Sequence, residues 1–323
     1  MGFKRYLLLR TAAAATTFFA SAILTFILFR LLPGDPTAMF VDPELPPEIK
    51  AQVIQQLGLA QPVPQQFTTF IVGIFSGNLG MSFSYREPVW DVLYPRIANT
   101  LSLAIAAAII AFSLAVLLGR YAGFREGSRV ERLLTSMVSA IGSMPLFVFG
   151  LLAILIFAII LPVFPYGLTH TIGFSGTGWE YYLSTDYLQH LMLPALTLGL
   201  SNLIFYYLIV RNATMNVNHS DFVEYLRARG ANSSVIKKHV TRNILLPLST
   251  VMANYFAFAL GGQIVIEIVF SWLGLGFTIV RAISGRDFPL VQGAFLLISL
   301  VAVVMMFISD LVYGLVDPRV RYS

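Results

Sequence analysis

The sequence predicts an all-α integral membrane protein with six transmembrane helices, cytoplasmic N- and C-termini and a small helical extracytoplasmic region between spans 1 and 2. Composition is the first reason. Hydrophobic residues make up 57% of the 323 residues and charged residues only 11%, whereas about 25% charge is usual in a soluble domain. The mean hydropathy is +0.77. The second reason is that uncharged apolar stretches recur at roughly the 20 residues that a helix needs to cross a bilayer.

Six such stretches are expected to be spans, and the whole chain, residues 1–323, is then one transmembrane domain. The expected spans cover residues 11–29, 98–119, 133–161, 191–210, 243–266 and 288–309. The first follows three basic residues, as the core of a signal peptide does. It is longer than the about 7–15 apolar residues of such a core, so it is interpreted as a span.

The distribution of lysine and arginine predicts the orientation. With a cytoplasmic N-terminus, the outer segments contain only a few of the 21 basic residues, and the inner segments contain the others. The outer ones are Arg30, Lys50, Arg86, Arg96, Arg281 and Arg286. The positive-inside rule therefore places both ends in the cytoplasm. The net charge of +5 reflects this asymmetry, and no nucleic-acid partner is expected because no basic patch is interleaved with aromatic residues.

Residues 33–97 form the one sizeable region outside the expected spans, and they contain two helix patterns. The first begins at Pro46 and ends at Gly58, with proline near the start and glycine after the end, as is usual for helices. The second aligns aromatic and aliphatic residues of segment 67–75 on one stripe and ends at Gly77. Two interpretations remain open and are compatible: a helical lid packed on the spans, or a docking surface for an external protein.

No enzyme motif is present, so no catalytic residue, metal site or cofactor is expected in this chain. A phosphate-binding P-loop needs a Gly-Lys pair, which the sequence lacks, and the Gly-x-Ser-x-Gly pattern of serine hydrolases is absent. The four histidines are scattered, and a chain without cysteine offers no thiolate ligand. The Gly274-Leu275-Gly276 segment is interpreted as a turn at the end of a span.

Two acids lie at the ends of expected spans. Glu267 is at the outer end of span 5 and Asp310 at the inner end of span 6. Each is either a hydrogen-bonded structural acid or a gate residue, because ionisable groups in a membrane are expensive and commonly functional. The middle of every span lacks charge, which disfavours a carrier driven by protons or sodium. The energy source is therefore expected outside this chain.

The cytoplasmic loop of residues 211–242 contains a short polar helix that a glycine ends. Ser220 and Asp221 precede the helix, and Asp221-x-x-Glu224 has the spacing of a capping box. Gly230 is expected to end the helix in the left-handed conformation. A second helix then begins near residue 232 and continues into span 5.

Phe222, Tyr225 and Leu226 are expected to share one face of this helix, with Arg227 and Arg229 turned elsewhere. A helix this short is marginal alone in water, where about 12–15 residues are needed. It is therefore expected to fit a groove on a partner. The alternative is an amphipathic helix lying in the membrane interface.

This loop resembles the EAA loop of ABC importer permeases. Glu224, Gly230 and Leu246-Pro247 match that motif, and residues 225–226 stand where the family has alanines. Other segments are similar, in order, to the dipeptide/oligopeptide/nickel permeases. They are Leu32-Pro33-Gly34-Asp35-Pro36, Leu57-Gly58-Leu59, Gly77-Asn78-Leu79-Gly80, Arg96-Ile97-Ala98-Asn99-Thr100-Leu101, Glu267-Ile268-Val269-Phe270 and Asp317-Pro318-Arg319.

The resemblance implies a multi-pass protein of the plasma or inner membrane that works by alternating access. Its implied partners are a second homologous permease subunit, two cytoplasmic ABC ATPase subunits that bind ATP and Mg, and an extracytoplasmic substrate-binding protein. The loop helix would then be the contact with one ATPase. The implied coupling residues are Asp221, Phe222, Glu224, Tyr225, Leu226, Arg227, Arg229 and Gly230.

The resemblance does not decide which class of substrate this chain transports. Di- and oligopeptides rank first, oligosaccharides close behind, and nickel third, because no histidine–carboxylate cluster favours a metal. A protein of another class, a self-contained channel or a membrane scaffold, would leave the outer region and the helix–glycine–helix loop unexplained.

Overall fold

The computed structural model describes residues 3–31, 46, 48, 54, 61–174, 176 and 178–316, without the side chains of residues 3–4, 29–31, 245–254, 256–262 and 309–316. Apart from residues 46, 48 and 54, the helix expected over residues 46–58 lies outside the described residues. The regular secondary structure of the described residues is helical, apart from one isolated antiparallel bridge between Met81 and Pro88. The helices are α1 (Phe3–Leu31), α4 (Val63–Ser76), α5 (Val89–Leu114), η1 (Ala115–Gly119), α6 (Arg120–Gly123), α7 (Arg129–Gly142), α8 (Leu146–Ile154), η2 (Leu155–Ile160), α9 (Gly178–Leu183), α10 (Thr185–Asn218), α11 (Asp221–Ala228), α12 (Ser233–Val269), α13 (Leu275–Ser284) and α14 (Phe288–Val316).

Four segments within the described residues are long and apolar enough to cross a membrane. They are Arg5–Leu28, Val89–Gly123, Thr185–Asn218 and Phe288–Ile308. The pair Arg129–Gly142 and Leu146–Ile160 gives a fifth if it is taken as one broken span. The remaining expected span, span 5 at residues 243–266, falls within α12, a continuous helix of 37 residues. The helical class is confirmed in the described residues, which agrees with an integral membrane protein, while the count of six spans stays a prediction.

The expected span of residues 133–161 is not one straight helix. Its two parts, α7 and α8, are bent by 95° at the break between Gly142 and Leu146. Pro145 precedes the first residue of α8. Proline has no N–H to continue a helix and disfavours the helical conformation of the residue before it, which explains why the helix stops here.

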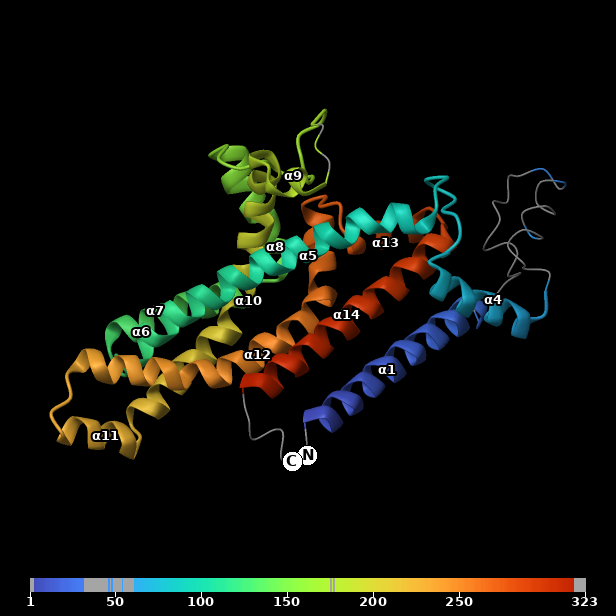
Figure 1. Ribbon diagram of the computed structural model, residues 1–323. Helices are drawn as coiled ribbons and strands as arrows, with labels where there is room; N and C mark the ends of the chain where they lie inside the picture. The colour runs from blue at the N-terminus through green and yellow to red at the C-terminus, as the bar shows by residue number, and fades with distance from the viewer. Residues whose placement is uncertain are drawn as a thin grey trace. The chain divides into compact units, whose positions relative to one another are not determined.

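The chain divides into two compact units, and the larger contains residues 101–272. Its central helix is α10, which η1, α6, α7, α8 and α12 contact (Figure 1). Gly119 of η1 and Gly123 of α6 allow the close approach of these two helices to α10. A Cβ at Gly119 would lie 2.9 Å from the carbonyl oxygen of Tyr207, and one at Gly123 would lie 2.6 Å from Cβ of Thr214. Small residues four apart commonly permit such contact between membrane helices.

The other unit contains residues 7–100 and 273–304. Its helix α4 lies next to the end of α1 (Figure 1). Aromatic rings make the contact, because the ring centroid of Phe26 lies 5.2 Å from that of Phe67 and 5.4 Å from that of Phe70. Gly77 ends α4 with a φ of 72°. The predicted aromatic stripe and its glycine stop are therefore confirmed, and this helix covers a span as the lid interpretation expects.

The corner between α13 and α14 is fixed by Asp287, which belongs to none of the sequence motifs. Its carboxylate is fully buried and accepts hydrogen bonds from the Ser82 hydroxyl and from the backbone N–H of Ser84, the latter at 2.9 Å. The same side chain accepts from the N–H of Leu290 at the start of α14. Asp287 thus joins the loop before α5 to the first turn of α14.

Candidate functional site

The helix–glycine–helix segment forms as the sequence predicted, except at its first cap. Helix α11 begins at Asp221, and Ser220 is its N-cap residue without a side-chain capping bond. The Ser220 hydroxyl instead donates to the carbonyl oxygen of Val217. The predicted capping box is therefore wrong, because Asp221 is already inside the first turn. Asp221 and Glu224 lie in that turn, where carboxylates stabilise the positive end of the helix dipole.

Gly230 ends α11 in the predicted conformation. Its φ is +75°, its N–H donates to the carbonyl of Arg227, and the N–H of Ala231 donates to the carbonyl of Leu226. These two bonds define a Schellman motif, which satisfies carbonyls that a helix end leaves free. No atom lies within 4 Å of an added Cβ, so glycine is required here for its conformation and not for space.

The predicted apolar face of α11 divides into an inner and an outer part. Val223 is fully buried, and Leu226 packs with it against Ile236 and Val240 of α12. Phe222 and Tyr225 are 46% and 57% exposed. The prediction of one shared face is therefore wrong for Leu226. Val223 was missed, although its three-residue spacing from Leu226 is the signal of a common helix face.

The outer surface of α11 combines aromatic and basic groups. The Phe222 ring meets the His239 ring of α12 with 5.9 Å between centroids. The Arg229 guanidinium lies over the Tyr225 ring, 5.5 Å from its centroid. Arg227 turns back and donates from Nη2 to Oδ1 of Asn218 at 2.8 Å. Two exposed aromatic rings with an adjacent guanidinium give a surface of the kind that anchors protein interfaces.

A buried ion pair supports the helix that leads into this loop. Glu131 of α7 is only 4% exposed, and Nη2 of Arg211 in α10 lies 2.6 Å from its Oε1. The Thr135 hydroxyl donates to the same carboxylate oxygen. Sequence reasoning missed Glu131. The sequence around Glu131 has the spacing of a capping box, and Ser128 accepts from the Glu131 N–H. This pattern marks the start of a helix. It does not reveal the ion-pair partner, which lies 80 residues away along the chain.

The two predicted acids differ in what the structure shows of them. Glu267 is fully buried near the end of α12, and its carbonyl accepts from the Trp272 N–H at 2.8 Å. Asp310 belongs to α14, but its side chain lies outside the described residues. In the described part of the chain, no three His, Asp or Glu side chains are grouped so that they could hold a metal ion.

Comparisons with known proteins cover nearly the whole chain. The family described as "Binding-protein-dependent transport system inner membrane component" matches residues 115–322, and its N-terminal companion matches residues 3–104. The di/tripeptide transport system permease protein DppB of Pseudomonas aeruginosa is 34% identical over 321 residues, which cover 95% of this chain and 96% of the relative.

Two further relatives are glutathione transport system permease proteins GsiC. The protein of Escherichia coli O6:H1 is 34% identical and that of Escherichia coli K12 is 33% identical, each over 98% of this chain and 99% of the relative. These matches confirm the resemblance that the sequence motifs carried. The chain therefore belongs to the family of binding-protein-dependent transport system inner membrane components, and it is a multi-pass permease subunit of an ABC importer.

Proposed function

We propose that this chain forms half of the translocation pathway of an ATP-driven importer for di- and oligopeptides, which an extracytoplasmic binding protein delivers. The observation that carries the substrate class is the full-length similarity to relatives named for di/tripeptide and glutathione transport. Glutathione is itself a tripeptide, so both names specify short peptides.

The assembly in this proposal contains a second, homologous permease subunit and two ABC ATPase subunits. ATP and Mg bind to those ATPase subunits, and this chain holds no cofactor. Residues 33–97 form its extracytoplasmic region, and residues 211–242 form its cytoplasmic coupling loop. The surface of α11 that carries Phe222, Tyr225 and Arg229 supports this assignment, because it offers an exposed aromatic anchor on a short helix.

Uptake by the reconstituted transporter tests the substrate class. We expect proteoliposomes that contain both permeases, both ATPases and the cognate binding protein to accumulate a labelled dipeptide or glutathione only with ATP inside. A labelled oligosaccharide and nickel serve as comparison substrates in the same vesicles. Uptake of either comparison substrate without uptake of peptide would contradict the proposed class.

Cysteine labelling tests the proposed orientation. The native chain contains no cysteine, so single-cysteine variants report one position each. Trp179 is 83% exposed in the short helix α9, on the proposed outer side, and Ser234 lies in the first turn of α12 on the proposed inner side. We expect Trp179→Cys to react with an impermeant maleimide on intact cells and Ser234→Cys to react only after permeabilisation. The reverse pattern would overturn the orientation and the coupling proposal with it.

Glu267→Gln tests whether this buried acid is structural or part of a gate. We propose a structural role, for Asp310 as well as for Glu267. A glutamine retains hydrogen bonding, so we expect normal assembly and most of the transport rate. Complex recovery, ATP hydrolysis and peptide uptake are the measurements. Lost uptake with intact assembly and intact ATP hydrolysis would instead assign the charge of Glu267 to the pathway or its gate.

A further inference from the structure

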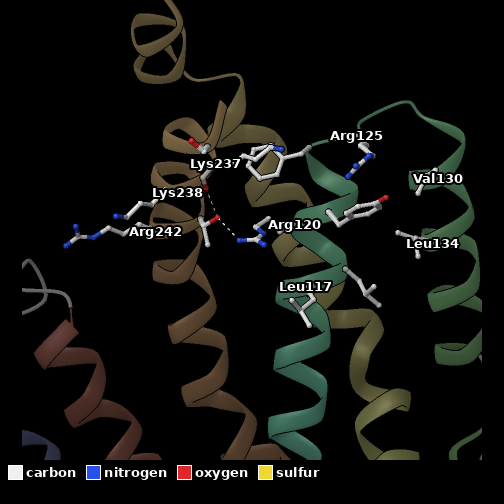
Figure 2. Close-up of a pocket in the computed structure, with 13 residues that line it drawn as sticks. Leu117, Arg120, Arg125, Val130, Leu134, Lys237, Lys238 and Arg242 are labelled. Atoms are coloured by element: carbon white, nitrogen blue, oxygen red, sulfur yellow. Dashed lines mark hydrogen bonds between the residues drawn. The ribbon is translucent and has the colours of Figure 1, made fainter. Parts of the chain in front are cut away.

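A cavity of about 870 Å³ lies between η1–α6, α7 and the first turns of α12 (Figure 2). Its lining is strongly basic. The cationic residues are Arg120, Arg125, Lys237, Lys238 and Arg242, and none of the described residues that line it is acidic. Such a concentration of like charge around one cavity favours an anionic occupant, because it raises the local concentration of negative groups.

The other walls of the cavity are apolar. They include Leu117 and Leu118 of η1, and Val130 and Leu134 of α7. The two leucines of η1 belong to the candidate span Val89–Gly123, close to its end. The cavity therefore passes from the apolar end of a membrane span to a basic rim. An occupant that matches both parts has an anionic head and a hydrocarbon chain.

Three of the cations come from α6, from the turn that follows it and from α12. Arg120 is held in place, since its Nη1 donates to Oγ1 of Thr241 at 3.2 Å (Figure 2). The Arg125 guanidinium lies over the Tyr121 ring, 3.7 Å from its centroid. Lys237 lies on α12 and lines, together with Arg125, both this cavity and a neighbouring one of about 490 Å³. Lys238 and Arg242 extend from the other side of α12 in Figure 2.

We propose that this cavity binds an anionic phospholipid, with the phosphate held by Arg120, Arg125 and Lys237 and an acyl chain along the leucine wall. Guanidinium groups recognise phosphate through paired hydrogen bonds, and an ammonium group adds a point charge. Basic pockets at the cytoplasmic ends of membrane helices commonly hold lipid head groups of this kind. The choice of the cytoplasmic leaflet follows from the proposed orientation, while the binding itself does not depend on the transported substrate.

The test is the lipid dependence of thermal unfolding in the purified, complete transporter. We expect dioleoyl phosphatidylglycerol to raise the unfolding temperature of the permease, and dioleoyl phosphatidylcholine or inorganic phosphate to leave it unchanged. The double variant Arg125→Gln/Lys237→Gln should lose at least half of the phosphatidylglycerol shift. The matched control Arg129→Gln/Arg132→Gln removes two exposed charges near the cavity, from residues that do not line it, and should keep the full shift.

Each alternative has its own outcome. An equal phosphatidylglycerol shift in both double variants would overturn the site. An equal shift with inorganic phosphate would show a free-anion site in place of a lipid site. Loss of ATPase subunits from Arg125→Gln/Lys237→Gln with the lipid shift retained would make the cavity a docking surface for an acidic protein. If that variant is not recovered folded, Lys237→Gln alone, which changes an exposed side chain, decides by the same measurement.

Discussion

Replacing Tyr225 by alanine is expected to remove most of the substrate-stimulated ATP hydrolysis of the assembled transporter while the permease still inserts in the membrane. Tyr225 is 57% exposed on α11 and lies under the Arg229 guanidinium. Truncating an aromatic anchor that fills a partner's pocket commonly costs about 2 kcal/mol or more, which corresponds to roughly 30-fold weaker docking. Co-elution of tagged ATPase subunits and the hydrolysis rate are the two measurements.

Gly230 gives an independent test of the same surface. Gly230→Val should be at least as harmful as Tyr225→Ala, because a β-branched residue resists the φ of +75° that ends α11. Gly230→Asn is the matched control, since asparagine accepts a left-handed conformation more readily. It should retain much of the activity, because no neighbouring atom opposes a side chain at this position.

Two further controls separate loss of an anchor from general damage. Tyr225→Phe keeps the ring and should retain most of the coupling. Trp179→Ala removes an aromatic residue that is 83% exposed on the proposed outer side, and should leave ATPase docking unchanged. Normal ATPase retention and normal stimulation in both Tyr225→Ala and Gly230→Val would reduce α11 to an amphipathic loop helix.

The second large effect concerns the Glu131–Arg211 ion pair. Glu131→Leu is expected to lower the free energy of unfolding by on the order of 3 kcal/mol, because it leaves the Arg211 guanidinium largely buried without its carboxylate partner. The double variant Glu131→Leu/Arg211→Leu should recover much of this loss, since a buried pair can often be replaced by apolar residues at little cost. Denaturant unfolding in detergent measures both.

An exposed contact between a histidine and a glutamate in the same region is the control. His219 Nε2 lies 2.7 Å from Glu126 Oε2, and their side chains are 64% and 46% exposed. Solvent screens such a pair, so Glu126→Gln should change stability by less than about 1 kcal/mol. A similar loss for Glu126→Gln and Glu131→Leu, or no rescue in the double variant, would show that burial does not set the strength of the Glu131 contact.

The sequence predicted the features of this fold that depend on neighbouring residues. The end of α11 at Gly230 and the aromatic stripe of α4 follow from helix periodicity and from the conformational freedom of glycine. The family followed from short motifs that occur in the same order along the chain, and these motifs need no knowledge of which helices pack together.

The features that the sequence predictions missed or got wrong have a different physical origin. Leu226 packs inward, together with Val223, against α12. Helix α11 has apolar residues on two sides, and no local pattern specifies which of these sides another helix will cover. The 95° break between α7 and α8 needed more than the presence of Pro145, because α10 tolerates Pro194 within a continuous helix. The partnership of Glu131 with Arg211 depends on helix packing between residues far apart in the sequence.

Site-directed photo-cross-linking from α11 is the most direct test of coupling between this permease and an ATPase. A photoreactive amino acid would replace Tyr225 in the assembled transporter, with a second variant carrying it at Trp179 as the control. We expect illumination to join position 225 to an ATPase subunit, with a change in yield when ATP is added, and position 179 to give no ATPase product. Cross-links from position 225 to lipid or to this chain alone would contradict the coupling role of α11.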